Sequence, residues 1–102
     1  MYDFEQVRPQ LEALCKRWGI RELTAFGSAV RENFKQTSDI DLIFELHDNS
    51  HFSLFDHFRL QRELKELLGR KVDLLTRDSL ASMRNPYRKK EILSKQQIIY
   101  GS

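Results

Sequence analysis

The chain has 102 residues, of which 40% are hydrophobic and 31% charged, and its formal net charge is +2. This length fits one domain, over residues 1–102, with a modest core, and the apolar content excludes a disordered chain. The weak positive charge does not by itself indicate nucleic-acid binding. The single cysteine, Cys15, excludes an internal disulfide, and no apolar run is long enough to span a bilayer. With no signal peptide at its start, we expect a cytoplasmic protein without membrane contact.

The first part of the chain predicts a helix, a strand and a turn. Apolar residues recur at helical spacing between residues 4 and 18, with Asp3 as N-cap and Gly19 as the stop. Pro9 lies inside this pattern and either kinks the helix or begins its main part. Residues 20–26 then predict a strand that ends at a Gly-Ser turn, followed by a short helix over 29–34 and a polar loop over 35–38.

Residues 39–46 alternate between apolar and acidic positions, which is typical of a half-buried strand. Ile40, Leu42, Phe44 and Leu46 share one side, which we expect helices to cover. Asp39, Asp41, Ile43 and Glu45 share the other, which we expect to line a cleft.

The second half repeats the alternation of helix and strand. A helix is predicted over 53–68 with Gly69 as its stop, a strand over 71–76, a short helix after 77–78 and a last helix over 85–94. The tail, 96–100, is either a short strand or a docked end. This order predicts a small α/β sandwich with a mixed sheet and helices mainly on one face. A core of this size also makes a partner chain or an oligomer plausible.

Gly27 and Ser28 form the first candidate site. Gly27 allows a sharp turn and a close approach to a ligand, and Ser28 opens the next predicted helix. The hydroxyl of Ser28 and the free N–H groups of a helix start suit an anion such as a nucleotide phosphate. Taken alone, the same dipeptide is also an ordinary turn glycine followed by an N-cap serine.

Three aspartates form the second candidate site. Asp39 and Asp41 lie two positions apart on a strand, hence on one face and about 6.6 Å apart along it. Two carboxylates about 5 Å apart repel by roughly 3 kcal/mol at an effective dielectric of about 20, so a Mg²⁺ ion would explain the pair. Asp73 lies in the apolar strand 71–76 and completes a triad if that strand is adjacent. The alternatives are a turn cap at Asp39, a solvated Asp41 and an edge-strand charge at Asp73.

Three segments, 26–28, 39–42 and 72–74, together resemble the nucleotidyltransferase superfamily of the DNA polymerase β type. More narrowly, the chain is similar to the minimal nucleotidyltransferases (MNT), which act as antitoxins beside HEPN-domain toxins. The resemblance covers nearly the whole chain and implies the polymerase β-like nucleotidyltransferase core. Three elements in this order and spacing make it specific.

The resemblance also implies roles for individual residues. In the family, the glycine and serine hold the triphosphate of ATP, the paired aspartates bind two Mg²⁺ ions, and the third aspartate helps to activate the acceptor hydroxyl. These roles fall on Gly27 and Ser28, on Asp39 and Asp41, and on Asp73.

The run 27–32 departs from the family pattern Gly-Ser-Arg-Ala-Arg-Gly. Ala29 replaces the first arginine and Glu32 the closing glycine. Arg31 matches the second arginine. It is either a nucleotide-binding residue or a charged residue exposed to solvent on the predicted helix. Because the first arginine is missing, the rate of nucleotide transfer and the choice of nucleotide do not follow from the family pattern.

Other candidates are weaker. His57, in the predicted helix 53–68, is expected to be a hydrogen-bonded core residue. Phe52 and Phe55 are expected to be core contacts at the helix start or part of a partner interface. Glu45 is expected to be solvated or to support the acidic site.

The expected function is transfer of AMP from ATP to a hydroxyl of a partner protein, which the resemblance identifies as a HEPN-type toxin. One alternative is an inactive antitoxin that neutralises its partner by complex formation alone. Another is nucleotidylation of a small molecule, for which the chain has no separate acceptor domain.

Overall fold

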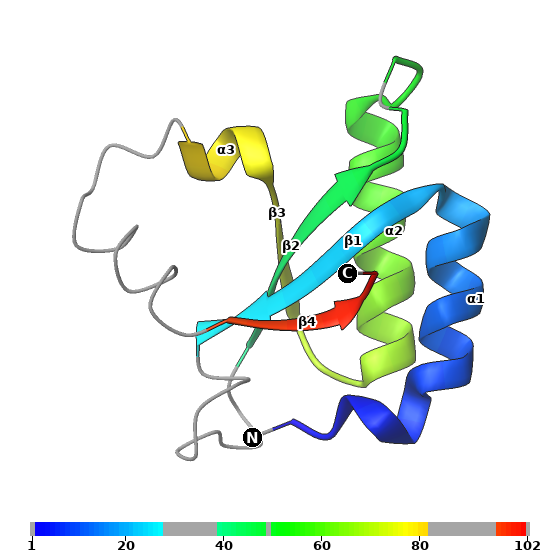
Figure 1. Cartoon of the computed structure of the whole chain (residues 1–102), viewed down its shortest axis with the longest axis vertical. Coiled ribbons are helices and arrows are strands. Elements are labelled where there is room, and N and C mark those ends of the chain that lie inside the picture. Colours follow the sequence, from blue (N-terminus) through cyan, green and yellow to red (C-terminus); the bar gives the residue numbers. More distant parts are fainter. Residues whose placement is uncertain (1, 28–38, 49, 82–95, 102) are drawn as a thin grey trace.

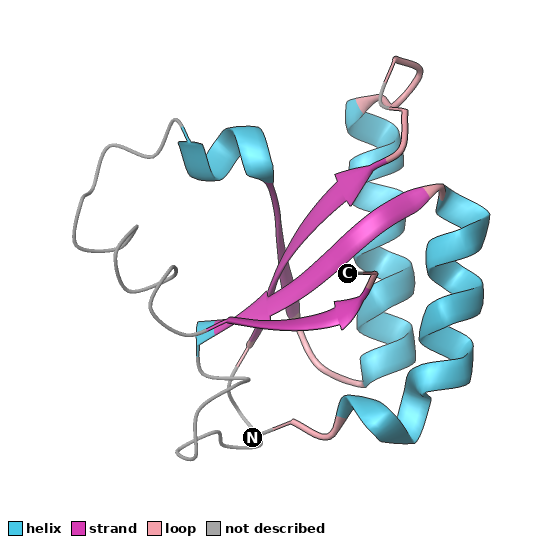
Figure 2. Ribbon diagram, in the orientation of Figure 1, coloured by secondary structure: helices cyan, strands magenta, loops and turns pink. Residues whose placement is uncertain are grey.

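The computed structural model describes residues 2–27, 39–48, 50–81 and 96–101, and Figure 1 shows their arrangement. A four-stranded sheet crosses the molecule, and two long helices pack against it (Figure 2). In chain order the elements are the 3₁₀ helix η1 (Phe4–Val7), α1 (Arg8–Trp18), β1 (Ile20–Phe26), β2 (Ile40–Leu46), α2 (Leu54–Leu68), β3 (Val72–Thr76), α3 (Arg77–Ala81) and β4 (Gln96–Tyr100).

The sheet is mixed, as the sequence predicts. Its strand order is β3-β2-β1-β4, in which β1 is antiparallel to both β2 and β4, and β2 is parallel to β3. The parallel pair β2 and β3 is joined by α2, which packs on the sheet as a crossover helix. The tail 96–100 is strand β4, an edge of the sheet, which settles the two alternatives for this segment.

The first helical segment begins and ends where the sequence predicts. Asp3 accepts a hydrogen bond from the backbone N–H of Glu5 (3.1 Å) at the start of η1, and Pro9 lies in the first turn of α1. Pro9 is therefore the second residue of the main helix, one position after its start at Arg8, where proline is tolerated without a kink. Gly19 ends the helix with a left-handed φ of 69°, which glycine adopts without a steric cost.

The long helix α2 is capped at both ends. Ser53 and Asp56 form a reciprocal capping box, a feature that stabilises a helix by about 1 kcal/mol, and Gly69 ends it. Leu60, Leu64 and Leu68 face the core at i, i+4 and i+8. The predicted helix and the observed one thus differ only in that Ser53 is the cap.

The core lies between the sheet and helices α1 and α2. Ile40, Leu42 and Phe44 enter it from β2, as the alternation predicts. On the opposite face of the sheet, Phe26 and Ile43 form a second, smaller buried cluster with Leu75 packed against it. That face is therefore not wholly a polar cleft, because an apolar patch crosses its centre.

Several sequence predictions concern residues outside those that the structure describes. These are the helices over 29–34 and 85–94, the loop over 35–38, and the site residues Ser28 and Arg31. Strand β2 begins at Ile40 rather than at Asp39, and β3 at Val72 rather than at Lys71. In the part of the chain that is described, no helix is both long and apolar enough to cross a bilayer.

Candidate active site

Asp41 and Asp73 lie directly opposite each other on the parallel strands β2 and β3. Paired positions in neighbouring strands project to the same face, so both carboxylates lie on the face opposite the main core. Both residues are half-buried. The condition that the sequence left open, which is whether the strand of Asp73 is adjacent to that of Asp41, is therefore met.

Asp39 is the residue directly before β2 and is exposed. Its neighbour Ile40 donates a backbone hydrogen bond to the carbonyl of Lys71 (2.9 Å), so the pairing of β2 with β3 reaches this end of the sheet. Asp39 therefore lies at the start of the strand that carries Asp41. The neighbouring strand at this point is β3.

Gly27 lies against the carboxylate of Asp41. It follows β1, whose last residue, Phe26, pairs with Asp41 across the antiparallel ladder. The φ of Gly27 is 69°, and a Cβ atom built there would lie 2.6 Å from Oδ2 of Asp41. Glycine suits this position because its φ is left-handed and because any side chain here would displace the carboxylate of Asp41.

These residues supply carboxylate oxygens, which Mg²⁺ prefers as ligands, but they do not surround an ion on all sides. Within residues 2–27, 39–48, 50–81 and 96–101, no three His, Cys, Asp or Glu side chains are gathered closely enough to hold a metal ion. Mg²⁺ is usually held by one or two carboxylates together with substrate phosphates and water. Asp41 and Asp73 on one face, with Asp39 at the strand start, fit that mode of binding better than a site built from protein ligands alone.

An ion-pair network occupies the far end of the same sheet face. Glu22 and Glu45 are paired across β1 and β2, and Arg77, the first residue of α3, contacts both carboxylates, at 3.9 Å from its Nε in the case of Glu45. Arg21 adds a second partner for Glu45. Glu45 is thus an ion-pair residue of this face. The network links α3 to the sheet, and nothing in the local sequence around Arg77 indicates it.

His57 behaves as the sequence predicts, and Cys15 is buried. His57 places Nε2 3.1 Å from the carbonyl oxygen of Leu74 and packs against Phe44, which makes it a hydrogen-bonded core histidine. Cys15 is fully buried, and burial raises the pKa of its thiol to about 12. This thiol is therefore protonated at neutral pH and is unsuited to act as a nucleophile.

Phe52 and Phe55 have different environments. Phe52 is half-buried and packs against Trp18 and Phe44 with ring centroids 6.2 and 5.5 Å apart, so it belongs to the core. Phe55 is 83% exposed on α2. Of these two residues, Phe55 is therefore the one that remains a candidate for a partner interface.

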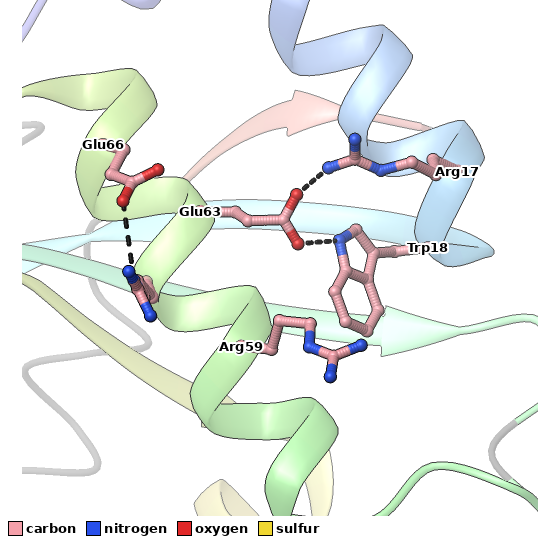
Figure 3. A pocket seen from close by; sticks show the side chains of 6 residues that line it. Arg17, Trp18, Arg59, Glu63 and Glu66 are labelled. Atoms are coloured by element: carbon pink, nitrogen blue, oxygen red, sulfur yellow. Dashed lines mark hydrogen bonds and ion pairs between the residues drawn. The ribbon is translucent and has the colours of Figure 1, made fainter.

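A pocket of about 590 Å³ lies where α1 and α2 meet, on the helical side of the molecule (Figure 3). The indole Nε1 of Trp18 donates a hydrogen bond to Glu63 (2.8 Å), and Arg17 forms an ion pair with the same carboxylate. The remaining lining residues are Arg59, Arg62 and Glu66. None of them belongs to the site that the sequence predicts.

Comparison with known proteins decides the family. Residues 7–99 match the family model described as a nucleotidyltransferase domain. The chain belongs to the nucleotidyltransferase family. The matched range includes the Gly-Ser turn and all three aspartates, and it confirms the resemblance that these segments carry and the enzyme class that it implies.

Two relatives within this family are similar to most of the chain. A protein of Methanocaldococcus jannaschii, provisionally named a protein adenylyltransferase, is 36% identical over 96 residues, which cover 94% of this chain and 91% of the relative. The protein adenylyltransferase MntA of Thermococcus cleftensis is 36% identical over 86 residues, which cover 80% of this chain and 85% of the relative.

Solved structures share the fold. One, provisionally described as a minimal nucleotidyltransferase, has a TM-score of 0.64 and 31% identity and covers 93% of this chain and 94% of its own. Another is a tri-AMPylated Shewanella oneidensis HEPN toxin in complex with an MNT antitoxin, with a TM-score of 0.64, 16% identity and coverage of 98% and 74%. The mixed sheet with helices is thus the fold of minimal nucleotidyltransferases.

Proposed function

We propose that this nucleotidyltransferase moves AMP from ATP to a hydroxyl group of a partner protein. The acceptor oxygen forms a bond to the α-phosphorus, the bond between the α-phosphorus and the bridging oxygen breaks, and pyrophosphate leaves. The observation that carries the proposal is the register of Asp41 with Asp73 beside the turn at Gly27. The names of the two relatives, both protein adenylyltransferases, support the choice of substrate class.

Asp73 is proposed to accept the proton of the acceptor hydroxyl. It is half-buried in a strand next to the one that carries Asp41, so its backbone position is held by the ladder between β2 and β3. A carboxylate held at a fixed distance from the reacting oxygen can act as a general base. The same residue can share in holding an ion with Asp39 and Asp41.

Asp39 and Asp41 are proposed to hold Mg²⁺, with two ions expected. Mg²⁺ bound there together with the triphosphate supplies positive charge that offsets the negative charge of the reacting phosphates. Asp41 is the anchor of this arrangement, because its carboxylate already lies against the turn of Gly27. Asp39 is exposed and directly precedes this strand.

The turn after β1 is proposed to bind the triphosphate. Gly27 leaves the space that a side chain would fill, and Ser28 and Arg31 follow it in the chain. A hydroxyl, backbone N–H groups at a helix start and a guanidinium group are suited to phosphate oxygens. Ala29 removes one arginine of the family pattern from this segment.

The partner is proposed to be a HEPN-domain toxin, met in the cytoplasm and silenced when a hydroxyl of it, such as a tyrosine hydroxyl, carries AMP. The support is the similarity of this fold to an MNT antitoxin in complex with a tri-AMPylated HEPN toxin. A second candidate function is neutralisation by binding alone. The loss of the first arginine at position 29 favours this alternative, since it weakens the expected phosphate contacts.

The test is the mass of the partner. The chain is incubated with ATP, Mg²⁺ and the HEPN-domain protein encoded beside it, and the partner is then weighed by intact-protein mass spectrometry. A mass increase of one or more AMP groups that is lost in Asp41→Asn and kept in Asp78→Asn, an exposed acid of α3, supports the transferase. Full inhibition of the toxin without any increase in mass, in the wild type and in Asp41→Asn alike, supports the binding antitoxin.

A further inference from the structure

The outward face of α2 carries exposed aromatic rings and guanidinium groups in a fixed order. Phe55 is 83% exposed and Phe58 is 60% exposed, and neither is packed into the core. Arg59 and Arg62 follow them, and the side chain of Arg62 is 81% exposed. Such large apolar groups on the surface indicate an interaction site.

These four residues lie on one side of the helix. Phe55 and Arg62 are seven residues, or two turns, apart and so share the centre of the outward face, while Phe58 and Arg59 flank it. We call them the α2 stripe. Its four positions are symmetric about the midpoint between residues 58 and 59, with both rings on one half and both arginines on the other.

This symmetry makes the stripe complementary to itself. If two copies of α2 pack antiparallel about that midpoint, Phe55 lies opposite Arg62 and Phe58 lies opposite Arg59, in both directions. A two-fold interface requires this reciprocity, in which one residue contacts a second and the second contacts the first. Each of the four contacts pairs an aromatic ring with a guanidinium group, a favourable cation–π arrangement.

We propose that the α2 stripe is the interface of a homodimer, with a second copy of this chain as its occupant. The pocket at the junction of α1 and α2 offers a place for the incoming rings, since Arg59 and Arg62 line it together with Trp18 (Figure 3). The Arg62–Glu66 contact at 3.5 Å, between two exposed side chains, does not hold Arg62 firmly. Arg62 is therefore available to a ring of the second copy.

The dimer leaves the candidate active site open. Helix α2 packs against the sheet (Figure 1), and its stripe lies on the side of the helix opposite the buried Leu60, Leu64 and Leu68. Asp41 and Asp73 alternate with core residues of β2 and β3 and so lie on the other face of the sheet. Each copy could thus meet its own protein acceptor. The inference does not rest on the proposed catalytic function, because it uses none of the site residues.

The first test is the mass of the chain in solution. Stable complexes bury about 1,200 Å² or more of surface. The proposed contact consists of four side chains of one helix in each copy, so the association is expected to be weak. Sedimentation equilibrium at concentrations up to about 1 mM should show an apparent mass that rises from 12.2 kDa towards twice that value. A mass that stays at that of one chain over the whole range overturns the proposal, even if another protein covers the stripe in the cell.

The second test examines the register with paired variants. Phe55→Arg with Phe58→Arg places arginine against arginine in a homodimer, and Arg59→Glu with Arg62→Glu places phenylalanine against glutamate. Each variant alone should sediment as a monomer. Mixed, the introduced arginines face the introduced glutamates and the native rings face native arginines, so the mixture should recover the dimer.

The control is Lys16→Glu with Lys71→Glu, which makes the same change of charge as Arg59→Glu with Arg62→Glu, at exposed positions outside the stripe. It should dimerise like the wild type, and thermal unfolding should show that all variants are folded. A wild-type dimer that survives in the stripe variants, or a mixture that stays monomeric, contradicts the proposed interface.

Discussion

Asp41 and Asp73 are neighbours across two parallel strands, and the carboxylate of Asp41 also lies against Gly27 at the end of a third segment. Two acidic side chains placed opposite each other on neighbouring strands destabilise a sheet. The arrangement is explained if a cation and a triphosphate use it.

Replacement of Asp73 by asparagine should abolish most of the transfer activity. The change keeps the shape of the side chain and removes its ability to accept a proton, so the rate of AMP transfer should fall by about 10²–10⁴-fold. The measurement is a time course of AMP incorporation with the partner in excess. Asp78→Asn, on the exposed surface of α3, is the control and should leave the rate unchanged. A normal rate in Asp73→Asn would remove this residue from the proposed mechanism.

Replacement of Gly27 by alanine should cost more stability than the same change at Gly69. Both glycines have a φ of 69°, so both variants carry the strain of a left-handed alanine, about 1–2 kcal/mol. Only at Gly27 does the added Cβ meet another atom, Oδ2 of Asp41 at 2.6 Å, whereas nothing lies within 4 Å at Gly69. Urea unfolding of the two variants should therefore give a larger loss for Gly27→Ala.

The excess loss at Gly27 should disappear when Asp41 is shortened. In the double variant Gly27→Ala with Asp41→Ala, the carboxylate that meets the new methyl group is absent, so the two losses should not add. Equal losses of unfolding free energy in Gly27→Ala and Gly69→Ala would mean that the contact with Asp41 does not affect stability.

Mg²⁺ should stabilise the folded chain through the carboxylates. An ion that binds only the folded state raises the free energy of unfolding, by about 2.7 kcal/mol when its concentration is 100 times the Kd. Thermal unfolding with and without Mg²⁺, in the presence of a non-hydrolysable ATP analogue, measures the gain. The gain should be lost in Asp41→Asn and retained in Asp48→Asn, an exposed acid in the turn after β2. An equal gain in both variants would argue against metal binding at Asp41.

Cys15 should make stability depend on pH at alkaline values. Its thiol has a pKa of about 12 in the folded chain, raised by burial from the model-compound value of 9.0 that applies when the chain is unfolded. Below pH 9 the thiol is protonated in both states, so its contribution is fully present. Above pH 9 only the unfolded chain releases the proton, and stability falls as the pH rises towards 12, by at most about 1.4 kcal/mol per pH unit.

The comparison with Cys15→Ala isolates this effect. The difference in free energy of unfolding between wild type and Cys15→Ala should be constant below pH 9 and should shift in favour of the variant above it. A difference that does not vary up to pH 11 would contradict the raised pKa.

Much of this architecture can be predicted from local sequence. Strand β1 has the predicted bounds, α2 and β2 differ from prediction by one residue, and the glycines at 19 and 69 end their helices as expected. These features depend on residues within a few positions of one another, such as the capping pair Ser53 and Asp56. The family resemblance of segments 26–28, 39–42 and 72–74 additionally predicts that Asp73 belongs to the same site as Asp39 and Asp41.

Contacts between distant residues could not be predicted in this way. The antiparallel placement of β4 beside β1, the burial of Ile43 on the acidic face, and the bridge from Arg77 to Glu22 all depend on how strands are ordered in the sheet. Phe52 illustrates the same point. The sequence left open whether it is a core contact or part of a partner interface, and Trp18 from another helix, which packs against it, makes it core.

The most direct test of the central proposal is the origin of the group that reaches the partner. The chain, Mg²⁺ and the HEPN-domain partner are incubated with ATP labelled at either the α- or the γ-phosphate, using wild type and Asp73→Asn. We predict that the α-label appears on the partner with wild type, that the γ-label leaves as pyrophosphate, and that Asp73→Asn transfers little of either. Transfer of the γ-label, or inhibition of the partner with no label bound to it, would contradict AMP transfer by this chain.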